Sequence, residues 1–198
     1  MFTAWLRKVA KVILDPLADG LVRLGLTANA VTIAGCIGTI LVSVFLVAQG
    51  RFFWGGVLFA LSSAVDALDG TLARRSSGPT AFGSFLDSVL DRVSESALLL
   101  ALAWWYLGQD QPVYVLLAYL TLVGSLLVSY TRAKAESLGV ECKVGLFTRV
   151  ERCIVLVLGM VLHLTAPMLW ILAIGASATA LHRVMHVHSR SKGKPLAP

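Results

Sequence analysis

The chain has 198 residues, of which 57% are hydrophobic and only 14% are charged, and its formal net charge is +6. This composition, with a mean hydropathy of +0.80, excludes an ordinary soluble domain and indicates a membrane protein with several spans. The basic excess would suit nucleic-acid binding, but the basic residues gather on one side of the predicted membrane. Such a distribution indicates orientation and contact with anionic lipids, so we expect no nucleic-acid partner.

The N-terminal segment, residues 1–24, repeats apolar side chains at helical spacing, with basic residues such as Arg7 and Lys11 between them. This pattern predicts an amphipathic helix that lies in the membrane interface. We expect residues 25–187 to form the transmembrane domain and residues 188–198 to form a basic cytoplasmic tail.

Six apolar stretches follow the N-terminal segment, and each predicts a transmembrane helix. They cover about residues 30–48, 52–73, 81–107, 113–135, 149–165 and 168–187. Thr27 is placed to cap the first of them. The run Trp104-Trp105-Tyr106 predicts an aromatic belt at the outer interface, and Ala166-Pro167 predicts a turn before the sixth span. The predicted fold is therefore all-α, an integral membrane domain of six transmembrane helices preceded by an interfacial helix.

The basic residues also predict how the chain is oriented. Every Lys and Arg except Arg51 falls on one side of this arrangement. Because cytoplasmic loops carry an excess of Lys and Arg, that side is predicted to be cytoplasmic. We therefore expect a multi-pass protein of the cell membrane, with both termini and the acidic motif described next on the cytoplasmic face.

Four carboxylates lie beside or within apolar segments, at Asp66, Asp69, Asp87 and Asp91. Each costs roughly 2.5–3.5 kcal/mol at membrane depth, so a partner must offset this cost. On helices, the first two share one face and the last two share another. A turn signal at residues 75–79 would fold the two helices back on each other, so that four carboxylates converge.

Carboxylates that are this close repel unless they are protonated or hold cations. A cluster with only oxygen ligands, without Cys or His, suits Mg²⁺, Mn²⁺ or Ca²⁺ better than Zn²⁺. Two divalent ions in such a site would stabilise charge in a phosphoryl displacement. The alternative is a set of acids at helix ends that meet lipid headgroups or basic loops.

The whole pattern, Asp-x2-Asp-Gly-x2-Ala-Arg-x8-Gly-x3-Asp-x3-Asp, resembles the signature of the CDP-alcohol phosphatidyltransferases. The matching positions are Asp66, Asp69, Gly70, Ala73, Arg74, Gly83, Asp87 and Asp91. The resemblance implies transfer of a phosphatidyl group from CDP-diacylglycerol or CDP-dialkylglycerol to a polyol phosphate, with release of CMP. It also implies two Mg²⁺ or Mn²⁺ ions per active site and a homodimer.

Residue roles follow from the same resemblance. It implies that all four aspartates hold metal and that Asp91 is also the general base for the acceptor hydroxyl. The segment Leu26 to Thr32 resembles the part of the first span that touches the nucleotide in this family, although a simple helix start explains it equally well. The residues implied to bind the CDP-lipid are Asn29, Thr32, Asp69, Gly70, Ala73, Arg74 and Gly83.

A second group of candidate residues is basic and falls at the cytoplasmic ends of the fourth, fifth and sixth spans. Its members are Arg132, Lys134, Arg149, Arg152 and Arg183. Several cations around one cavity would bind a second phosphate. The group resembles the branch of the family that makes phosphatidylinositol phosphate or its archaeal ether-lipid equivalent, with a swapped order in Arg132-Ala-Lys134. Anchoring of the chain by snorkelling side chains is the alternative.

Inositol 1-phosphate is the acceptor that this basic group favours, and glycerol 3-phosphate is the second choice. A cationic alcohol such as choline would be repelled by the group. From a different class of protein, a divalent-cation transporter would use the same carboxylates as a pathway. A transporter predicts acids along a pore on several helices, whereas here all four lie on two helices at one depth.

Overall fold

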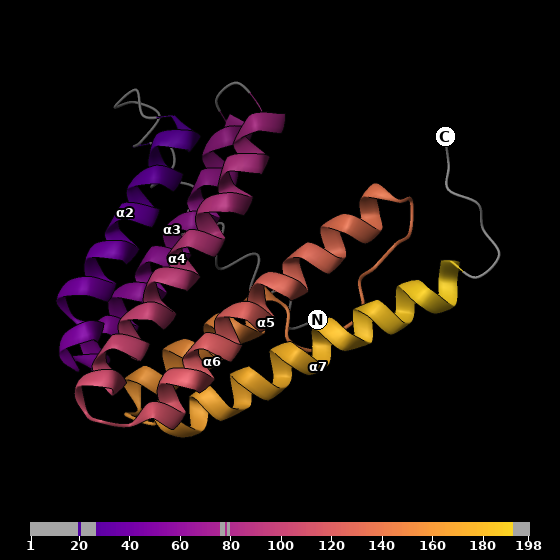
Figure 1. Ribbon diagram of the computed structural model, residues 1–198. Helices are drawn as coiled ribbons and strands as arrows, with labels where there is room; N and C mark the ends of the chain where they lie inside the picture. Colours follow the sequence, from indigo (N-terminus) through magenta and orange to yellow (C-terminus); the bar gives the residue numbers. More distant parts are fainter. Residues whose placement is uncertain (1–19, 21–26, 76–77, 79, 192–198) are drawn as a thin grey trace, which may run out of the picture. The chain divides into compact units, whose positions relative to one another are not determined.

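The computed structural model describes the backbone of residues 20, 27–75, 78 and 80–191, and the side chains of these residues except 65–75 and 191. Within this part the regular structure is entirely helical (Figure 1), and the all-α prediction is confirmed there. A short 3-10 helix, η1, covers Val47–Gln49. The α-helices are α2 Ala28–Phe45, α3 Phe52–Arg75, α4 Ala81–Gly108, α5 Pro112–Ser137, α6 Arg149–Val161 and α7 Thr165–Ser191. The predicted interfacial helix lies almost wholly outside the described residues.

Three segments are long and apolar enough to cross a membrane: Ala28–Gln49, Pro112–Ser137 and Thr165–Arg190. Helices α3 and α4 have sufficient length, 24 and 28 residues, but both carry the acidic motif. Helix α6 has only 13 residues, or about 20 Å, against a hydrocarbon core of about 30 Å. The six helices thus match the six predicted spans in position, and three of them qualify as spans by length and composition.

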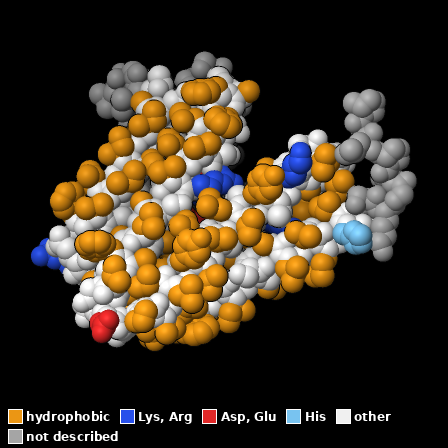
Figure 2. Space-filling view, in the orientation of Figure 1, with side chains coloured by type: hydrophobic (Ala, Val, Ile, Leu, Met, Phe, Trp, Pro, Cys, Tyr) orange, Lys and Arg blue, Asp and Glu red, His pale blue; other side chains and the backbone are white. Residues whose placement is uncertain are grey.

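Large apolar side chains cover much of the visible helix surface, as Figure 2 shows. Leu100, Trp104 and Ile174 keep 58%, 68% and 63% of their surface exposed, and many similar residues lie on every helix. A soluble monomer rarely exposes apolar patches of this extent. The exposed apolar helix faces therefore indicate an integral membrane protein.

The chain divides into two compact units. The first contains α2 up to Val42, α3 from Leu58 and α4 up to Glu95, and its three helices run side by side in Figure 1. Ser62 on α3 donates its hydroxyl hydrogen to the carbonyl oxygen of Gly35 on α2 at 3.0 Å. Its oxygen also lies 2.8 Å from the Thr39 hydroxyl, which therefore acts as the donor. Small hydroxyl residues join helices in this way where lipid surrounds them.

The second unit contains residues 43–57 and the chain from Ser96 onward. In it, α7 packs along α5 and also against α6. A Cβ on Gly124 of α5 would lie 3.0 Å from the Cβ of Ala176 on α7, so small residues allow the close approach of these two helices.

Local signals in the sequence explain several helix ends. The Ala30 amide donates to the hydroxyl oxygen of Thr27 at 3.2 Å, which confirms the predicted cap of α2. The predicted turn at Ala166-Pro167 is wrong, because both residues lie in the first turn of α7. Amides of a first helical turn have no partner within the helix, so Pro167 loses nothing there. The chain turns instead at residues 162–164, where His163 has a φ of 56°.

The three residues of the predicted aromatic belt differ in burial and contacts. Trp104 points outward, but the Trp105 ring meets the Phe52 ring with centroids 4.7 Å apart. Tyr106 is only 3% exposed, and its hydroxyl lies 2.7 Å from that of Thr165 on α7. Two of the aromatic residues thus pack inside the second unit.

Candidate active site

Helix α4 presents a row of acids. Asp87, Asp91 and Glu95 follow one another at intervals of four residues, so they share one face of the helix. Asp91 is 8% exposed and Glu95 is 5% exposed, while Asp87 is half-buried. Arg92 approaches Asp91, with 4.0 Å between Nη1 and Oδ2. Burial of carboxylates in a membrane helix requires compensation by protons, hydrogen bonds or cations, and this row is a natural place for cations to bind.

The other half of the predicted motif lies on α3, whose backbone is helical through Arg75. The side chains of its members fall outside the described set, so convergence of four carboxylates stays a prediction. Among the side chains that are described, no three acidic, His or Cys groups come together as a metal site, but only two of the four predicted ligands belong to that set. The α3 members are Asp66, Asp69, Gly70, Ala73 and Arg74.

Two of the predicted nucleotide-binding residues are brought together by α2 and α4. A Cβ on Gly83 would lie 3.0 Å from Oδ1 of Asn29 and 3.0 Å from the hydroxyl oxygen of Thr80. That hydroxyl accepts a hydrogen bond of 2.9 Å from the Gly83 amide. Thr32, one turn after Asn29, is buried and donates to the carbonyl oxygen of Ala28 at 3.0 Å. Its hydroxyl hydrogen is therefore already engaged in the helix.

Sequence reasoning overlooked Thr80 and Glu95 in this unit. Thr80 stands just before α4 and three residues before Gly83, which is the spacing of an N-cap. Glu95 continues the four-residue spacing of Asp87 and Asp91. Both signals were present in the sequence, and the second would have extended the acidic row by one turn.

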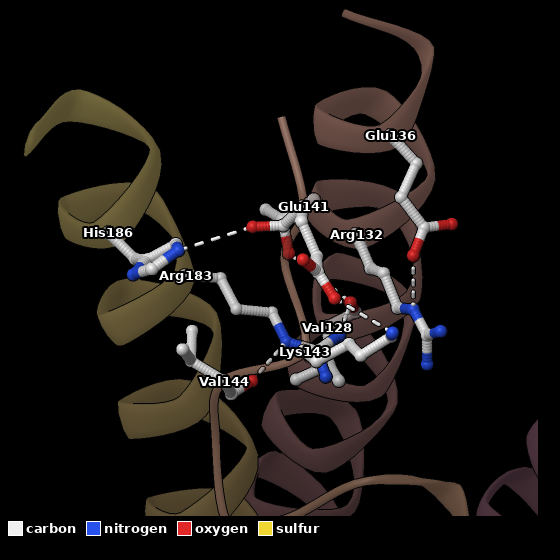
Figure 3. Close-up of polar contacts among 9 residues, drawn as sticks. Val128, Arg132, Glu136, Glu141, Lys143, Val144, Arg183 and His186 are labelled. Carbon is white, nitrogen blue, oxygen red and sulfur yellow. Dashed lines mark hydrogen bonds and ion pairs between the residues drawn. The ribbon is translucent and has the colours of Figure 1, made fainter. Parts of the chain in front are cut away.

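In the second unit, the predicted basic residues differ sharply in burial. Arg183 on α7 is only 2% exposed. Figure 3 shows its side chain among the backbone carbonyls of neighbouring segments. Its Nε donates to the carbonyl oxygen of Val144 at 2.9 Å, and its Nη1 donates to that of Val128. Among the described residues, no carboxylate forms an ion pair with Arg183. This guanidinium is thus held in a fixed position by neutral groups that do not cancel its charge.

Arg152 on α6 is buried in the same unit, with 1% of its surface exposed. Its Nη1 donates to the carbonyl oxygen of Phe147 at 3.2 Å. Both buried arginines are therefore held by backbone carbonyls of one segment, residues 139–148, which connects α5 to α6. We call this segment the 139–148 loop.

The remaining basic candidates lie nearer the surface. Arg132 is exposed and pairs with Glu136 one turn later, with 2.8 Å between Nε and Oε1 (Figure 3). Lys134 is exposed and Arg149 is half-buried. In the loop itself, Lys143 bonds Glu141 at 2.8 Å, and this hydrogen bond lowers the pKa of the Glu141 carboxyl and raises that of the Lys143 ammonium. The structure thus separates two buried arginines from three more accessible cations.

A helical membrane protein with a row of acids, two of them buried, and two buried arginines fits an integral membrane enzyme that acts on phosphate-bearing substrates. The CDP-alcohol phosphatidyltransferase family model matches residues 25–182, and the chain belongs to that family. Membership confirms the prediction, made from the acidic motif, of a transferase of phospholipid biosynthesis.

Two curated relatives illustrate the likeness. The chain is 36% identical over 187 residues to a phosphatidylinositol phosphate synthase of Corynebacterium glutamicum, covering 90% of this chain and 85% of that protein. It is 41% identical over 154 residues to an archaetidylinositol phosphate synthase of Methanothermobacter thermautotrophicus, covering 77% of this chain and 74% of the other. The predicted resemblance to this branch of the family is confirmed.

Solved structures show the same fold. The phosphatidylinositol phosphate synthase of Mycobacterium tuberculosis with CDP-DAG bound matches with a TM-score of 0.86 and 30% identity, over 94% of this chain and 99% of that one. The same synthase in complex with manganese and citrate matches with a TM-score of 0.84 and 31% identity, over 89% of each chain. Both the sequence and the fold therefore agree with the predicted function.

Proposed function

We propose that this chain transfers the phosphatidyl group of CDP-diacylglycerol, or the equivalent group of CDP-dialkylglycerol, to inositol 1-phosphate and releases CMP. The names of the relatives support this reaction, since both describe synthases of inositol phosphate lipids. The observation that carries the choice of acceptor is the burial of Arg152 and Arg183.

A buried guanidinium retains its charge, because its pKa is too high for it to lose its proton. Carbonyl oxygens satisfy some of its donors, but they do not neutralise it. Among the described residues, Arg183 donates to two carbonyl oxygens, so an anion is the partner that would complete its site. A phosphate accepts two parallel hydrogen bonds from a guanidinium, which makes a phosphorylated acceptor the economical ligand. Arg132, Lys134 and Arg149 would add positive charge around it.

The donor set suits hard divalent cations. Asp66, Asp69, Asp87 and Asp91 would hold two Mg²⁺ or Mn²⁺ ions, which would offset the negative charge on the phosphates and on the departing CMP. Asp87 and Asp91 lie on one face of α4, and the burial of Asp91 favours a compensating cation. Manganese in the Mycobacterium tuberculosis synthase is consistent with this assignment.

The chain's own residues would then act as follows. Asp91 would accept the proton of the acceptor hydroxyl, and the freed oxygen would attack the phosphorus that bears the lipid. The bond from this phosphorus to the CMP oxygen would break. Arg74 would hold the pyrophosphate. Asn29 and Gly83, with Thr32, Asp69, Gly70 and Ala73, would bind the nucleotide.

We further propose that the chain crosses the cell membrane six times after an N-terminal interfacial helix, with both termini in the cytoplasm, and that it forms a homodimer. The match of the six helices to the predicted spans supports the topology. The distribution of Lys and Arg supports the orientation.

A panel of acceptors tests the reaction. Purified protein in detergent with CDP-diacylglycerol and Mg²⁺ is given inositol 1-phosphate, free inositol, glycerol 3-phosphate or serine, and CMP release and the lipid product are measured. We expect product with inositol 1-phosphate and none with free inositol. Turnover with glycerol 3-phosphate alone would transfer the assignment to phosphatidylglycerophosphate synthesis. Turnover with an unphosphorylated alcohol would show that the buried arginines do not bind an acceptor phosphate.

A further inference from the structure

The 139–148 loop follows one face of α7 without forming a helix. As the loop runs from Glu141 to Val144, its contacts on α7 move from His186 to Arg183, toward the start of that helix (Figure 3). The Glu141 carbonyl oxygen lies 3.2 Å from Nε2 of His186, and the Val144 carbonyl accepts from Arg183. Farther along, the Phe147 amide donates to the hydroxyl oxygen of Thr179 at 3.2 Å.

Two glycines bring the loop and the helix into direct contact. Gly145 has a φ of +110°, and a Cβ there would lie 2.4 Å from Cγ2 of Thr179. A Cβ on Gly175 of α7 would lie 2.6 Å from the Phe147 ring. His186, Arg183, Thr179 and Gly175 are spaced by three or four residues, as one face of a helix requires. The loop therefore packs against α7 from Glu141 to Phe147.

Phe147 connects these contacts with α7 to the candidate phosphate site. Its amide is held by Thr179 and its ring is held against Gly175, while its carbonyl oxygen binds Arg152. Three residues earlier, the Val144 carbonyl binds Arg183. One short segment thus contacts both buried guanidinium groups, and the Thr179 hydroxyl holds that segment at the Phe147 amide.

We propose that Thr179 is a positioning residue for the acceptor phosphate: it holds the 139–148 loop so that the carbonyls of Phe147 and Val144 set the places of Arg152 and Arg183. This inference rests on the proposed function. Thr179 acts through the loop and does not itself bind the acceptor. Loss of its hydroxyl leaves the Phe147 amide without its partner and lets the loop shift, which displaces Arg152.

The test compares Thr179→Val with Thr179→Ser. Valine keeps the shape of threonine and removes the hydroxyl, whereas serine keeps the hydroxyl. For Thr179→Val we expect the acceptor KM to rise about tenfold while the CDP-diacylglycerol KM changes less than about twofold. For Thr179→Ser we expect both values near those of the unaltered chain. Glu141→Gln is the control within the loop, because it alters only the exposed pair that Glu141 forms with Lys143.

A second measurement reports on the loop without reference to activity. Cys142 is a loop residue with 0% of its surface exposed, and Cys36 and Cys153 are the other cysteines. With Cys36→Ala and Cys153→Ala in place, the rate of maleimide labelling measures exposure of Cys142. We expect Thr179→Val to accelerate labelling about tenfold and Thr179→Ser and Glu141→Gln to leave it unchanged.

Arg152→Ala and Arg183→Ala separate this inference from the proposed function. If both raise the acceptor KM while Thr179→Val changes neither that KM nor the labelling rate, the positioning role is wrong and the proposed function stands. If neither arginine variant raises the acceptor KM, the phosphate site is wrong and the positioning role falls with it. If Thr179→Val raises the KM of both substrates equally, the hydroxyl serves the fold alone, and the inference is again overturned.

Discussion

The Oδ1 atom of Asn29 on α2 lies where residue 83 of α4 can carry no side chain: a Cβ on Gly83 would sit only 3.0 Å away. The same Cβ would meet the Thr80 hydroxyl, which caps α4 through the Gly83 amide. The close approach therefore joins the start of α2 to the start of α4, two segments far apart in the sequence. Both residues belong to the proposed nucleotide site.

The Gly83→Ala substitution tests this relationship. The added methyl group must displace Asn29 or Thr80, so we expect the KM for CDP-diacylglycerol to rise roughly tenfold. Gly38→Ala is the matched control, because nothing lies within 4 Å of its Cβ position on α2. An unchanged KM in Gly83→Ala, or an equal rise in both variants, would contradict the proposed contact with the nucleotide.

The acidic motif should be required for turnover. Replacing Asp66, Asp69, Asp87 or Asp91 by Asn removes a negative ligand without changing the size of the side chain, and we expect each variant to lose about 100-fold or more in CMP release. EDTA should abolish the activity of the unaltered chain, and added Mn²⁺ or Mg²⁺ should restore it.

Asp110→Asn is the control for these substitutions, because Asp110 is an exposed turn residue whose φ of 56° asparagine tolerates. It should retain full activity. Two or more near-normal variants among the four aspartates, or full activity in EDTA, would exclude a site with two metal ions.

The buried pair of Tyr106 and Thr165 should contribute to stability. Tyr106→Phe leaves the Thr165 hydroxyl without its partner at 2.7 Å, which costs about 1–3 kcal/mol. We expect thermal unfolding in detergent to shift downward by several degrees. Tyr119→Phe is the control, since Tyr119 is 60% exposed and should leave the melting temperature unchanged. Equal shifts in the two variants would mean that the buried hydroxyl adds nothing.

Thiol labelling tests the orientation. In a chain whose native cysteines are replaced, Gln109→Cys and Ser137→Cys place single thiols at opposite ends of α5, which is long and apolar enough to cross the membrane. In intact spheroplasts, an impermeant maleimide should label residue 109 and not residue 137. Both should react after permeabilisation. The reverse pattern would place the acidic motif outside the cell, where CDP-lipids are absent.

The helices were predicted closely from sequence because their signals are local. Pro112, the Thr27 cap and the apolar runs put helix ends within a few residues of their observed places. Helix α5 ends in a similarly local way, where the Val140 amide bonds the Ala135 carbonyl across Gly139, whose φ is +72°. Helix α6 ends earlier than predicted. The prediction missed this end because the turn at His163 contains no glycine or proline.

The burial of individual side chains could not be predicted from the sequence. Arg132 follows the apolar run of α5 and Arg152 precedes that of α6, yet one is exposed beside Glu136 and the other is buried against a carbonyl oxygen. Every residue has a backbone carbonyl, so the sequence does not indicate which carbonyls bind Arg152 and Arg183. The role of Thr179 depends on a loop 32 positions away and follows only from tertiary structure.

The shortness of α6 has a consequence for the loop that precedes it. Helix α7 has 27 residues and runs about 40 Å, twice the length of α6, and a three-residue turn joins their ends. The 139–148 loop therefore lies beside α7 where a longer α6 would have continued as a helix. Peptide groups at membrane depth are stable only when protein or water surrounds them. The contacts that the loop makes with Arg183 and Thr179 on α7 satisfy part of this requirement.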